Sequence, residues 1–550
     1  MFSRKNAVIL SLLVVGVCYA NALPNDFVLD DVAIVGSNLA VRSITPIQFL
    51  LSPYWSEQQY GGIYRPFTIF SLSIDYALWK TWAPGFRITN LLIHALNGFL
   101  LFLLCESLVQ SFSSVPKYAA MVIYLAHPVH TEAVTSIVGR SELFATCFFL
   151  SAWLLFRSGK TAFAAILFLL ALLSKENAIV LPAVLALDIL LSHGIDIKKV
   201  VAAWKRLAVI GVVAIGYLAL RYSVLGGIGI PVSAQYMGGR LSYLERWMTS
   251  GRVLIEYFRL IVAPLNVAGD YDFNAIPIAG IRDWDAWLGL LLLAGTLALA
   301  YLYRRRNWIL TLGLLFAITA FIPVSNWIMP ISILMAERSL YLPMAGLALT
   351  GGILFSEIPK ASIRRVVGAG WLVLAILLCI DHAYIWRNDF TFFRNMVRVE
   401  PQSAKARLGY GFTLLGAGFK EDAAHQLQEG LRILPDYPAL LSTLALTKMT
   451  QKNCDDAWPL LRRALEINPK HGDTLRRVAD CLYREGDIEK AEAMYRKALD
   501  FIPYPDSLLL FMWGKSLEET GQKGQAIAAY ERAALIDPKN MLIKQKLGAQ

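Results

Sequence analysis

Residues 7–34 read AVILSLLVVGVCYANALPNDFVLDDVAI and decide the class of fold, because a cluster of carboxylates directly follows an apolar run. The run Ala7–Leu23 is long enough to cross a bilayer, and two basic residues precede it. Basic residues on this flank favour a cytoplasmic N-terminus, which would place Asp30 and Asp31 on the outer side. A cleaved signal peptide ending near Ala20–Ala22 is the alternative.

The carboxylates of this stretch are the best candidates for chemistry in the chain. Asp30 and Asp31 are adjacent, and Asp26 precedes them. Two neighbouring carboxylates at a bilayer surface can supply a general base and orient a hydroxyl acceptor, or they can share a divalent cation. The alternative interpretation is a solvated acidic turn that caps a helix, because Asp favours both positions.

The composition is that of a polytopic membrane protein. Of the 550 residues, 56% are hydrophobic, and the mean hydropathy is +0.49, far above the average of soluble proteins. The formal net charge is +11, but no basic stripe with interleaved aromatic residues is present, so we expect no nucleic-acid partner. The cysteines show neither a CxxC pair nor a Cys/His zinc spacing, which argues against structural zinc.

Apolar segments predict an all-α membrane bundle of about eleven spans within residues 1–385. After the first span, these segments cover roughly 88–109, 118–136, 142–157, 161–174, 177–192, 206–222, 284–303, 307–325, 340–356 and 366–385. The outer loop 24–86 mixes polar and aromatic residues, which suits helices that lie in the membrane interface.

The segment Val253–Val267 decides the topology. It lies within residues 223–283 and is apolar but interrupted by charged residues, and we interpret it as interfacial or re-entrant. This choice places the basic connections, among them Arg304–Arg306 and Arg364-Arg365, in the cytoplasm. Everything after Trp386 would then lie outside the cytoplasm, in a bacterial periplasm or in the lumen of the endoplasmic reticulum.

Residues 386–550 contain an internal repeat. The spacing is 34 residues between successive members of the series Pro401, Pro435, Pro469 and Pro503, and Pro538 follows after 35. Small residues recur at shared positions before the prolines, where paired helices would touch. This period and pattern indicate tetratricopeptide (TPR) repeats, about four of them over 404–538. Turns within the repeats are predicted at Gly418, Gly486 and Gly521.

The predicted TPR array suggests a polypeptide partner. Such arrays bind peptides or protein segments on a concave face, and the alternative role is scaffolding or dimerisation. Cys454 would begin the second helix of one repeat, and Cys481 lies late in the first helix of the next. Because these helices are antiparallel neighbours, the two thiols could form a disulfide in an oxidising compartment.

Ionisable residues gather where the third predicted span ends. His127, His130 and Glu132 would lie at the outer membrane surface, on the side of the twin aspartates. They could ligate a metal, or they could bind a phosphate through protonated imidazole. The alternative is a hydrogen-bonded knot that braces two helix ends.

Four cations are predicted on the same membrane face: Arg65, Arg140, Lys175 and Arg338. Arginine and lysine beside a lipid headgroup can neutralise a departing phosphate, as a lipid-linked phosphate donor requires. Each cation could instead pair locally, for example Lys175 with the adjacent Glu176 or Arg338 with the adjacent Glu337.

Several short motifs, taken in order, resemble a known family. They are Phe27-Val28-Leu29-Asp30-Asp31, Tyr64-Arg65-Pro66, His127-Pro128 with His130-Thr131-Glu132, Gly139-Arg140-Ser141-Glu142, Ser174-Lys175-Glu176 and Glu337-Arg338-Ser339-Leu340-Tyr341-Leu342-Pro343. Together with a C-terminal TPR array, they resemble the transmembrane-and-TPR-containing protein O-mannosyltransferases, a family of the GT-C glycosyltransferase group. The four clear repeats resemble its prokaryotic relatives, since animal members have more.

The resemblance implies an inverting enzyme that transfers mannose from a polyprenyl or dolichyl phosphate to a Ser or Thr hydroxyl. It implies that Asp31 together with Asp30 serves the acceptor, and that the four cations above bind the donor phosphate. The pocket residues it implies are Tyr64, His127, His130, Glu132, Glu142, Glu176, Glu337 and Tyr341. The partners are membrane lipids, the lipid-linked sugar and an acceptor polypeptide held by the TPR face; no cofactor is required, although a divalent cation fits the acidic pair.

Two other functions fit parts of the sequence. A non-catalytic membrane anchor whose TPR array recruits proteins would tolerate loss of Asp30 and Asp31. A transporter of lipid-linked sugars would need charges in mid-span or two matching halves with broken helices, and no such symmetry is found. The clustering of ionisable groups at one surface favours surface chemistry over transport.

Overall fold

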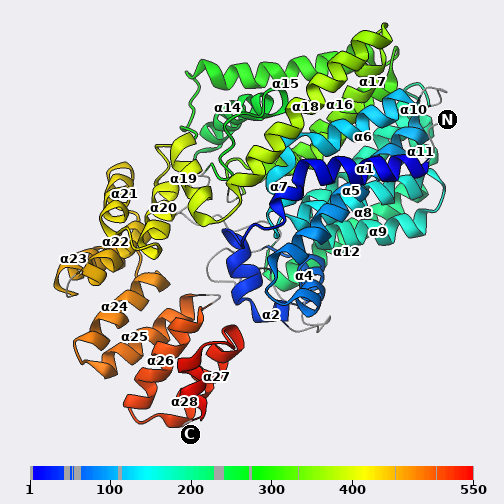
Figure 1. The fold of residues 1–550 in the computed structure, drawn as a ribbon. Helices are drawn as coiled ribbons and strands as arrows, with labels where there is room; N and C mark the ends of the chain where they lie inside the picture. Colours follow the sequence, from blue (N-terminus) through cyan, green and yellow to red (C-terminus); the bar gives the residue numbers. More distant parts are fainter. Residues whose placement is uncertain are drawn as a thin grey trace.

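The computed structural model describes residues 4–42, 50–51, 54, 63–109, 114–227, 241–271, 275–331, 333–451, 454–502 and 505–548. The repeat position Pro503 and parts of the predicted segments 24–86 and 223–283 lie outside these residues. Within them every regular element is a helix, as predicted (Figure 1).

Helices cover all of the apolar segments predicted from the sequence. They are α1 (Arg4–Tyr19), α5 (Ala83–Leu108), α6 (Val115–Ala126), α8 (Arg140–Arg157), α9 (Thr161–Ser174), α10 (Leu181–Ser192), α12 (Trp204–Leu225), α15 (Trp284–Tyr303), α16 (Trp308–Phe321), α17 (Pro343–Ser356) and α18 (Ala361–Ile385). Among the described residues, five helices are long and apolar enough to cross a membrane, or six if one bent pair counts as a span. The remaining apolar helices are shorter, so the number of spans is smaller by this measure than the eleven predicted.

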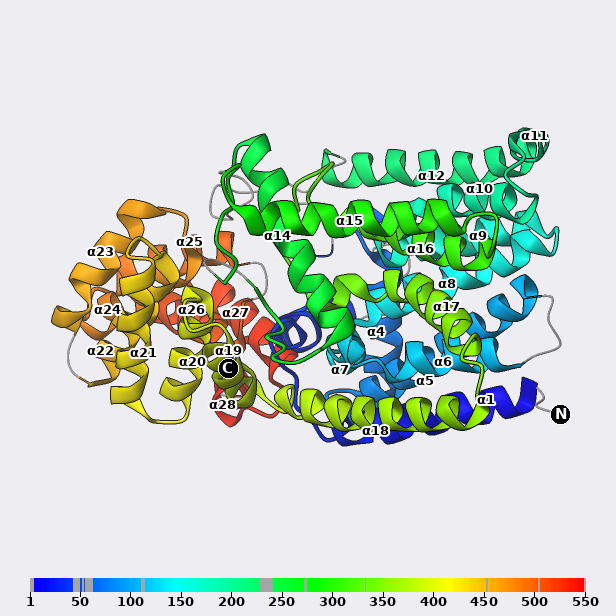
Figure 2. The same ribbon diagram turned by 90° about the horizontal axis from the view of Figure 1, so that it is seen from above.

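The helices of the bundle run side by side, and glycines allow the closest approaches (Figure 2). A Cβ atom added to Gly289 of α15 would lie 1.8 Å from the carbonyl oxygen of Gly251. A Cβ atom added to Gly346 of α17 would lie 2.5 Å from the carbonyl oxygen of Gly313 on α16. In an apolar environment such small residues replace hydrophobic burial as the source of helix packing, because they let backbones touch.

Gly251 belongs to α14 (Tyr243–Val262), the helix that contains most of the segment predicted to be interfacial or re-entrant. It begins with a capping box in which Ser242 and Glu245 satisfy each other's backbone N–H groups. In Figure 2, α14 runs obliquely to the other helices of the bundle.

The third predicted span ends in a sharp bend. Helix α6 is followed by the short helices η3 (Pro128–His130) and α7 (Thr131–Thr135), and the combined segment 128–135 meets α8 at 109°. Gly139 is needed at this bend, because a Cβ atom there would lie 2.3 Å from the carbonyl oxygen of Ala133. The bend brings Glu132 beside the loop that contains the twin aspartates.

The described residues between 20 and 79 contribute to the loop side of the site. Their described helices are η1 (Ala20–Ala22), η2 (Val32–Ser37), α2 (Leu39–Arg42) and α4 (Pro66–Trp79). Two further short helices, η4 (Glu176–Val180) and η6 (Glu337–Leu340), precede α10 and α17 at the same end of the bundle, and η5 (Ile322–Val324) follows α16.

The C-terminal third is a stack of antiparallel helix pairs. They are α20 (Ala404–Gly416) with α21 (Lys420–Ile433), α22 (Pro438–Gln451) with α23 (Trp458–Ile467), α24 (Gly472–Arg484) with α25 (Ile488–Phe501), and α26 (Ser507–Glu519) with α27 (Lys523–Ile536), followed by α28 (Met541–Gly548). The turn glycines Gly418, Gly486 and Gly521 have φ values of +89°, +87° and +81°, which L-residues with a side chain rarely adopt. The predicted turns are thereby confirmed.

A disulfide joins two neighbouring repeats. Cys454 and Cys481 are bonded, with their Cα atoms 5.7 Å apart. Cys454 lies in the short helix η7 (Cys454–Asp456) before α23, and Cys481 lies in α24. The other four cysteines, which are in the bundle, are free and buried.

The repeats leave the bundle through α19 (Asp389–Val399), which packs on the loop before the twin aspartates. The Asp26 N–H donates to the Arg387 carbonyl oxygen at 2.9 Å, and the Leu29 N–H donates to the Asp389 carboxylate at 3.0 Å. The repeat helices therefore start directly beside the candidate site.

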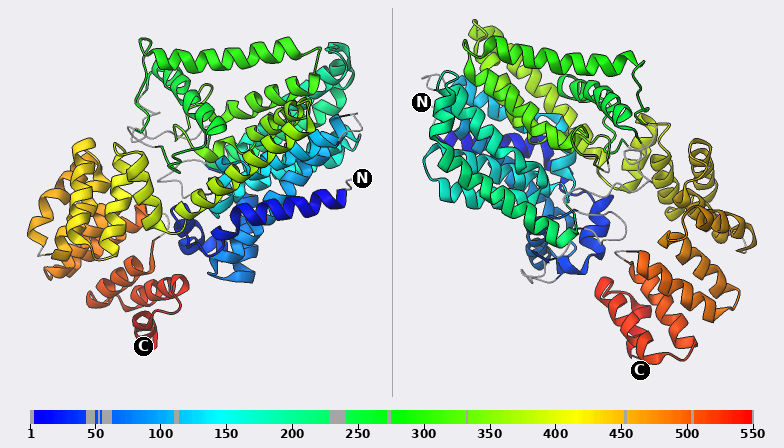
Figure 3. Two further views of the ribbon diagram at one scale, coloured as in Figure 1. Left: turned by 45° about the horizontal axis from the view of Figure 1, so that its top comes forward. Right: turned by 180° about the vertical axis from the view of Figure 1, so that it is seen from behind.

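The stack then curves back toward the same loop (Figure 3). Arg42, at the end of α2, donates a hydrogen bond to the carbonyl oxygen of Leu535 in α27. The repeats thus meet the bundle side of the molecule at both α19 and α27.

Candidate functional site

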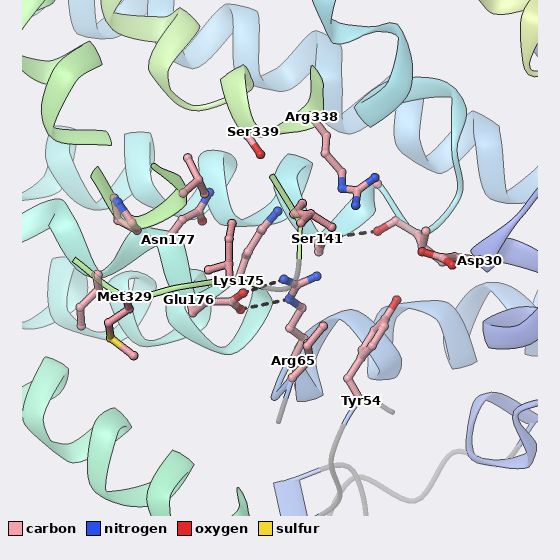
Figure 4. A pocket seen from close by; sticks show the side chains of 18 of the residues that line it. Asp30, Tyr54, Arg65, Ser141, Lys175, Glu176, Asn177, Met329, Arg338 and Ser339 are labelled. Carbon is pink, nitrogen blue, oxygen red and sulfur yellow. Dashed lines mark hydrogen bonds and ion pairs between the residues drawn. The ribbon is translucent and has the colours of Figure 1, made fainter. Parts of the chain in front are cut away.

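A cavity of about 390 Å³ lies at the end of the bundle nearest the repeats. Segments far apart in the sequence contribute its polar lining, including the loop before η2, α7, η4, α12 and η6 (Figure 4). The polar and charged lining residues are Asp30, Tyr54, Arg65, Glu132, Ser136, Ser141, Lys175, Glu176, Asn177, Tyr217, Arg221, Arg338 and Ser339. One wall is apolar and is built from residues 322–324 and 328–331 together with Ile179, Val180 and Leu218.

Asp30 is the carboxylate of the twin pair that lines this cavity. Leu29 before it has φ +55°, a conformation that costs energy for a bulky residue, and Asp389 holds its N–H. Asp30 is half-buried, and its carboxylate accepts no hydrogen bond from the residues that the structure describes. Burial raises its pKa, while the positive charges of Arg338 and Lys405 oppose that rise.

Asp31 points away from the cavity and is fully buried. Its carboxylate accepts hydrogen bonds from the N–H groups of Ile137 at 3.1 Å and Val138 at 2.9 Å, and from Ser136 Oγ at 3.3 Å. Burial raises its pKa to about 6, although Arg87 and the two backbone donors oppose the rise. These hydrogen bonds attach the loop that contains Asp30 to the turn at residues 136–138.

Arg338 and Glu132 form an ion pair in the lining of the cavity. The Arg338 guanidinium pairs with Glu132, and the Arg338 backbone N–H also donates to that carboxylate at 2.7 Å. The Arg338 side chain remains 30% exposed, whereas Glu132 is 1% exposed. Because one guanidinium carries five N–H donors, Arg338 can hold Glu132 and still contact a ligand.

Arg65 and Lys175, two further predicted phosphate-binding cations that line the cavity, are paired across elements. Arg65 makes a two-pronged contact with Glu176, at 2.7 and 3.1 Å, as Figure 4 shows. Lys175 pairs with Glu142, which also accepts from Asn177 Nδ2 at 3.1 Å. The suggested local pairs, Lys175 with Glu176 and Arg338 with Glu337, are wrong, because successive side chains on a short helical turn point in different directions.

Arg140 does not line the cavity. Its side chain is 0% exposed, pairs with Asp75 at 2.5 Å and donates to Asn90 Oδ1 at 2.9 Å. It therefore ties α8 to α4 and α5 beneath the site, and the structure separates it from the other three predicted phosphate-binding cations.

The two histidines also lie outside the cavity lining. His130 is fully buried among the rings of His94, Tyr124 and Tyr341, whose centroids lie 5.6, 4.7 and 4.7 Å from its own. His127 contacts the carbonyl oxygen of Ile261 at 3.0 Å through Nε2. The His127 contact is of the kind expected for a hydrogen-bonded knot at the helix ends. Both ring nitrogens of His130 are buried without a hydrogen-bond partner among the described residues, so His130 contributes ring packing only.

Tyr64, Tyr341 and Glu337 are not among the residues that line the cavity. Tyr64 donates to the Leu50 carbonyl oxygen at 2.8 Å, and the Tyr341 hydroxyl lies 2.7 Å from His94 Nδ1. Glu337 is buried, and its oxygen accepts from three groups of one loop, namely the Ala268 N–H at 3.1 Å, the Gly269 N–H at 3.4 Å and the Tyr271 hydroxyl at 2.7 Å. Burial raises the Glu337 pKa to about 7.

The sequence interpretation missed several lining residues. Arg221 of α12 is 3% exposed inside an apolar helix, and a charged residue within a predicted span is a recognisable signal of function. Trp386 and the wall at residues 322–324 and 328–331 carry no comparable signal, since apolar and aromatic residues are ordinary in a membrane protein.

The described residues contain no group of three or more His, Cys, Asp or Glu side chains placed to hold a metal ion. Asp30 and Asp31 point in different directions, so they do not form the shared cation site considered for them.

Comparisons with known proteins agree with the predicted resemblance. Two family models described as tetratricopeptide repeat match residues 436–503 and 509–540. A protein O-mannosyl-transferase of Caenorhabditis elegans is 25% identical over 450 residues, which cover 79% of this chain and 63% of that protein. In Homo sapiens, protein O-mannosyl-transferases TMTC3 and TMTC4 are 24% and 28% identical, covering 96% and 74% of this chain and 64% of each relative.

The similarity to the protein O-mannosyl-transferases thus extends over most of this chain, and the predicted family resemblance is confirmed. The chain spans a little under two thirds of the length of these relatives. Among solved structures, a TPR protein of Thermus thermophilus is 19% identical and covers 32% of this chain and 93% of that chain, with a TM-score of 0.26, too low to support an inference.

Proposed function

We propose that this chain is a membrane glycosyltransferase that transfers a mannosyl group from a polyprenyl- or dolichyl-phosphate donor to a Ser or Thr hydroxyl of a polypeptide. The observation that carries the proposal is the cavity itself. It combines Asp30, a carboxylate without a hydrogen-bond donor among the described residues, with the partly exposed cation Arg338 and an apolar wall. These are the three surfaces that an acceptor hydroxyl, a phosphate and a lipid chain require.

Asp30 serves the acceptor in this proposal. Its carboxylate accepts the proton of the hydroxyl while the hydroxyl oxygen attacks the anomeric carbon of the sugar. A general base works best when its pKa lies near the ambient pH, and burial moves the pKa of Asp30 in that direction. Asp31 acts through position, because it fixes the backbone of the cavity edge at Ile137 and Val138.

Arg338, with Lys175 and Arg65, serves the donor. As the new glycosidic bond forms, the bond between the anomeric carbon and the phosphate oxygen breaks, and the lipid phosphate leaves with the electron pair. Charge-assisted hydrogen bonds from guanidinium and ammonium groups stabilise that developing charge. Arg338 is the most exposed of the three cations, so it is the best placed for direct contact.

The disulfide supports an orientation with the repeats outside the cytoplasm. Structural disulfides persist in oxidising compartments and are rare in the cytosol. The Cys454–Cys481 bond lies in the repeats, and α19 joins those repeats directly to the Asp30 loop. The reaction would therefore take place on the non-cytoplasmic side of the membrane, at the same end of the bundle as the repeats.

The proposal is tested by a transfer assay with the purified chain in lipid nanodiscs. Radiolabelled mannosyl-phosphoryl-polyprenol is supplied with a library of Ser- and Thr-containing peptides, and label in peptide is measured. We expect transfer by the wild type and a loss of roughly 100-fold or more in D30N. The matched control is D26N, an exposed carboxylate in the same loop, which should keep full activity. Full activity in D30N would remove Asp30 as the base, and no transfer from any lipid-linked sugar would favour the scaffold function.

A further inference from the structure

A second, larger cavity lies in the bundle away from the Asp30 cavity. Its volume is about 930 Å³, and it is an open groove between α6 and α17 on one side and α18 on the other. The lining is mainly apolar, with Asn6, Ser114, Tyr118 and His127 also among its residues, and small residues such as Ala119 and Gly351 leave room along it. None of the groups assigned above to the acceptor or to the donor lines it, although His127, which the family resemblance implies for the pocket, is among its lining residues.

The groove is about as long as one leaflet of a bilayer is thick. Along α17 its lining extends from Met344 to Phe355, a separation of eleven helical steps, which corresponds to about 16 Å at the helical rise. Half of a hydrocarbon core of about 30 Å is about 15 Å. An acyl chain that starts at one end of the groove would therefore reach the other, and an unfilled apolar groove would lose its dispersion contacts.

One end of the groove is basic. Arg364 and Arg365, at the start of α18, line it there. Among the described residues neither arginine forms an ion pair; the recorded contact of Arg364 is with the carbonyl oxygen of Ile358 at 3.3 Å. Residues 357–365 contain Lys360 and these two arginines against the single acid Glu357. A phosphate at this position would find two guanidinium groups that have no acidic partner among the described residues.

We propose that this groove is a binding site for an anionic membrane phospholipid, with the phosphate on Arg364 and Arg365 and one acyl chain along α6, α17 and α18. Charge complementarity selects an anionic headgroup, and the length and apolar lining select an acyl chain. The site lies at the end of the bundle opposite the repeats, since α18 runs from this end to α19 (Figure 2). Binding is independent of the proposed transfer reaction and is measured without it.

The test measures lipid retained by the full chain after purification in detergent. The protein is titrated with phosphatidylglycerol and with phosphatidylcholine of identical acyl chains, and native mass spectrometry counts bound lipids. We expect saturable binding of phosphatidylglycerol at least about tenfold tighter than that of phosphatidylcholine, and loss of this preference in R364Q/R365Q. The matched charge control is R305Q/R306Q, which removes two arginines from another connection outside the groove.

Substitutions that fill the groove with a large side chain test whether the acyl chain binds there. A119F should lower the affinity for phosphatidylglycerol about tenfold or more, whereas A369F, which adds the same bulk to an exposed position of α18 outside the groove, should not. G351L is the second filling variant, used if A119F does not fold. Equal binding of the two lipids by the wild type would overturn the site. So would equal losses in R364Q/R365Q and R305Q/R306Q, or normal binding in correctly folded A119F and G351L, because each would leave only general surface attraction.

Discussion

At the scale of residues, the twin aspartates have different environments although they are adjacent. Asp31 is enclosed by the N–H groups of the turn at 137–138, and Asp30 faces the cavity. The sequence cannot distinguish them, because both are acidic and both follow the same apolar run. The difference arises from the loop, where the φ of +55° at Leu29 sets the direction of the side chain that follows.

This difference predicts opposite phenotypes for two conservative variants. D30N should lower kcat by roughly 100-fold to 10,000-fold without changing the melting temperature, because it removes a base that holds no donor. D31N should destabilise the folded chain by about 1–3 kcal/mol, because it weakens a buried acceptor of two N–H groups. Transfer kinetics and thermal unfolding in the same nanodiscs measure both. Equal thermal destabilisation by the two variants would contradict the assignment.

The electrostatic surroundings of Asp30 predict a pair of pH shifts. Lys405 lowers the pKa of Asp30 and Asp270 raises it, and these two side chains are paired at 2.5 Å. The base must be ionised to act, so activity is lost as the pH falls through its pKa. K405M should therefore move the acid limb of kcat/KM to higher pH, by roughly half a unit, and D270N should move it to lower pH.

The pH dependence of the transfer rate from pH 4 to 9 tests this prediction. K497M, which removes an exposed lysine elsewhere in the repeats, is the control and should leave the profile unchanged. Shifts of the same sign in K405M and D270N would argue that Asp30 is not the titrating base.

The ion-pair partners of the cations in the site could not be predicted from the sequence. The motif positions grouped Arg65, Arg140, Lys175 and Arg338, and all of these except Arg140 line one cavity. Their partners, however, come from other elements: Glu142 for Lys175 and Glu132 for Arg338. Such pairs depend on where helices end in space, and a single sequence contains no record of that.

At the scale of elements, composition and period were sufficient to find the helices. The apolar segments and the 34-residue repeat correspond to helices in the structure, because both signals are properties of consecutive residues. The bend of 109° before α8 was not predicted. It depends on contact between Gly139 and the carbonyl oxygen of Ala133, and a glycine in a span has many other possible meanings.

The α14–α15 contact gives a prediction with a matched control. G289L should lower the free energy of unfolding by about 1–3 kcal/mol or more, and with it the melting temperature. The reason is that its side chain would collide with the backbone of α14 at Gly251. G295L lies on the same helix with nothing within 4 Å of the added Cβ atom and should leave stability unchanged. Thermal unfolding followed by fluorescence compares the two. A larger effect of G295L would contradict the packing described for this pair.

At the scale of the whole molecule, the disulfide predicts both a stability and a compartment. Closing a loop of 27 residues stabilises the repeats by about 3–4 kcal/mol in the chain-entropy description. Reductant should lower the unfolding free energy of the repeats in the wild type by about that amount and should have no effect on C454S/C481S.

Maleimide labelling of denatured protein from cells should modify four of the six cysteines before reduction and all six after it. Six labelled cysteines without reduction would place the repeats in a reducing compartment.

The two attachments of the repeat stack, at α19 and through Arg42 to Leu535, carry a consequence for the order of events in the cell. A substrate that approaches Asp30 between them passes through a frame anchored at both ends. An unfolded polypeptide can pass between two such attachments, whereas a folded domain cannot unless the Arg42 contact breaks. Under the proposed reaction, a hydroxyl would be glycosylated while its own chain is still emerging and unstructured, and the same hydroxyl would be refused once its domain has folded.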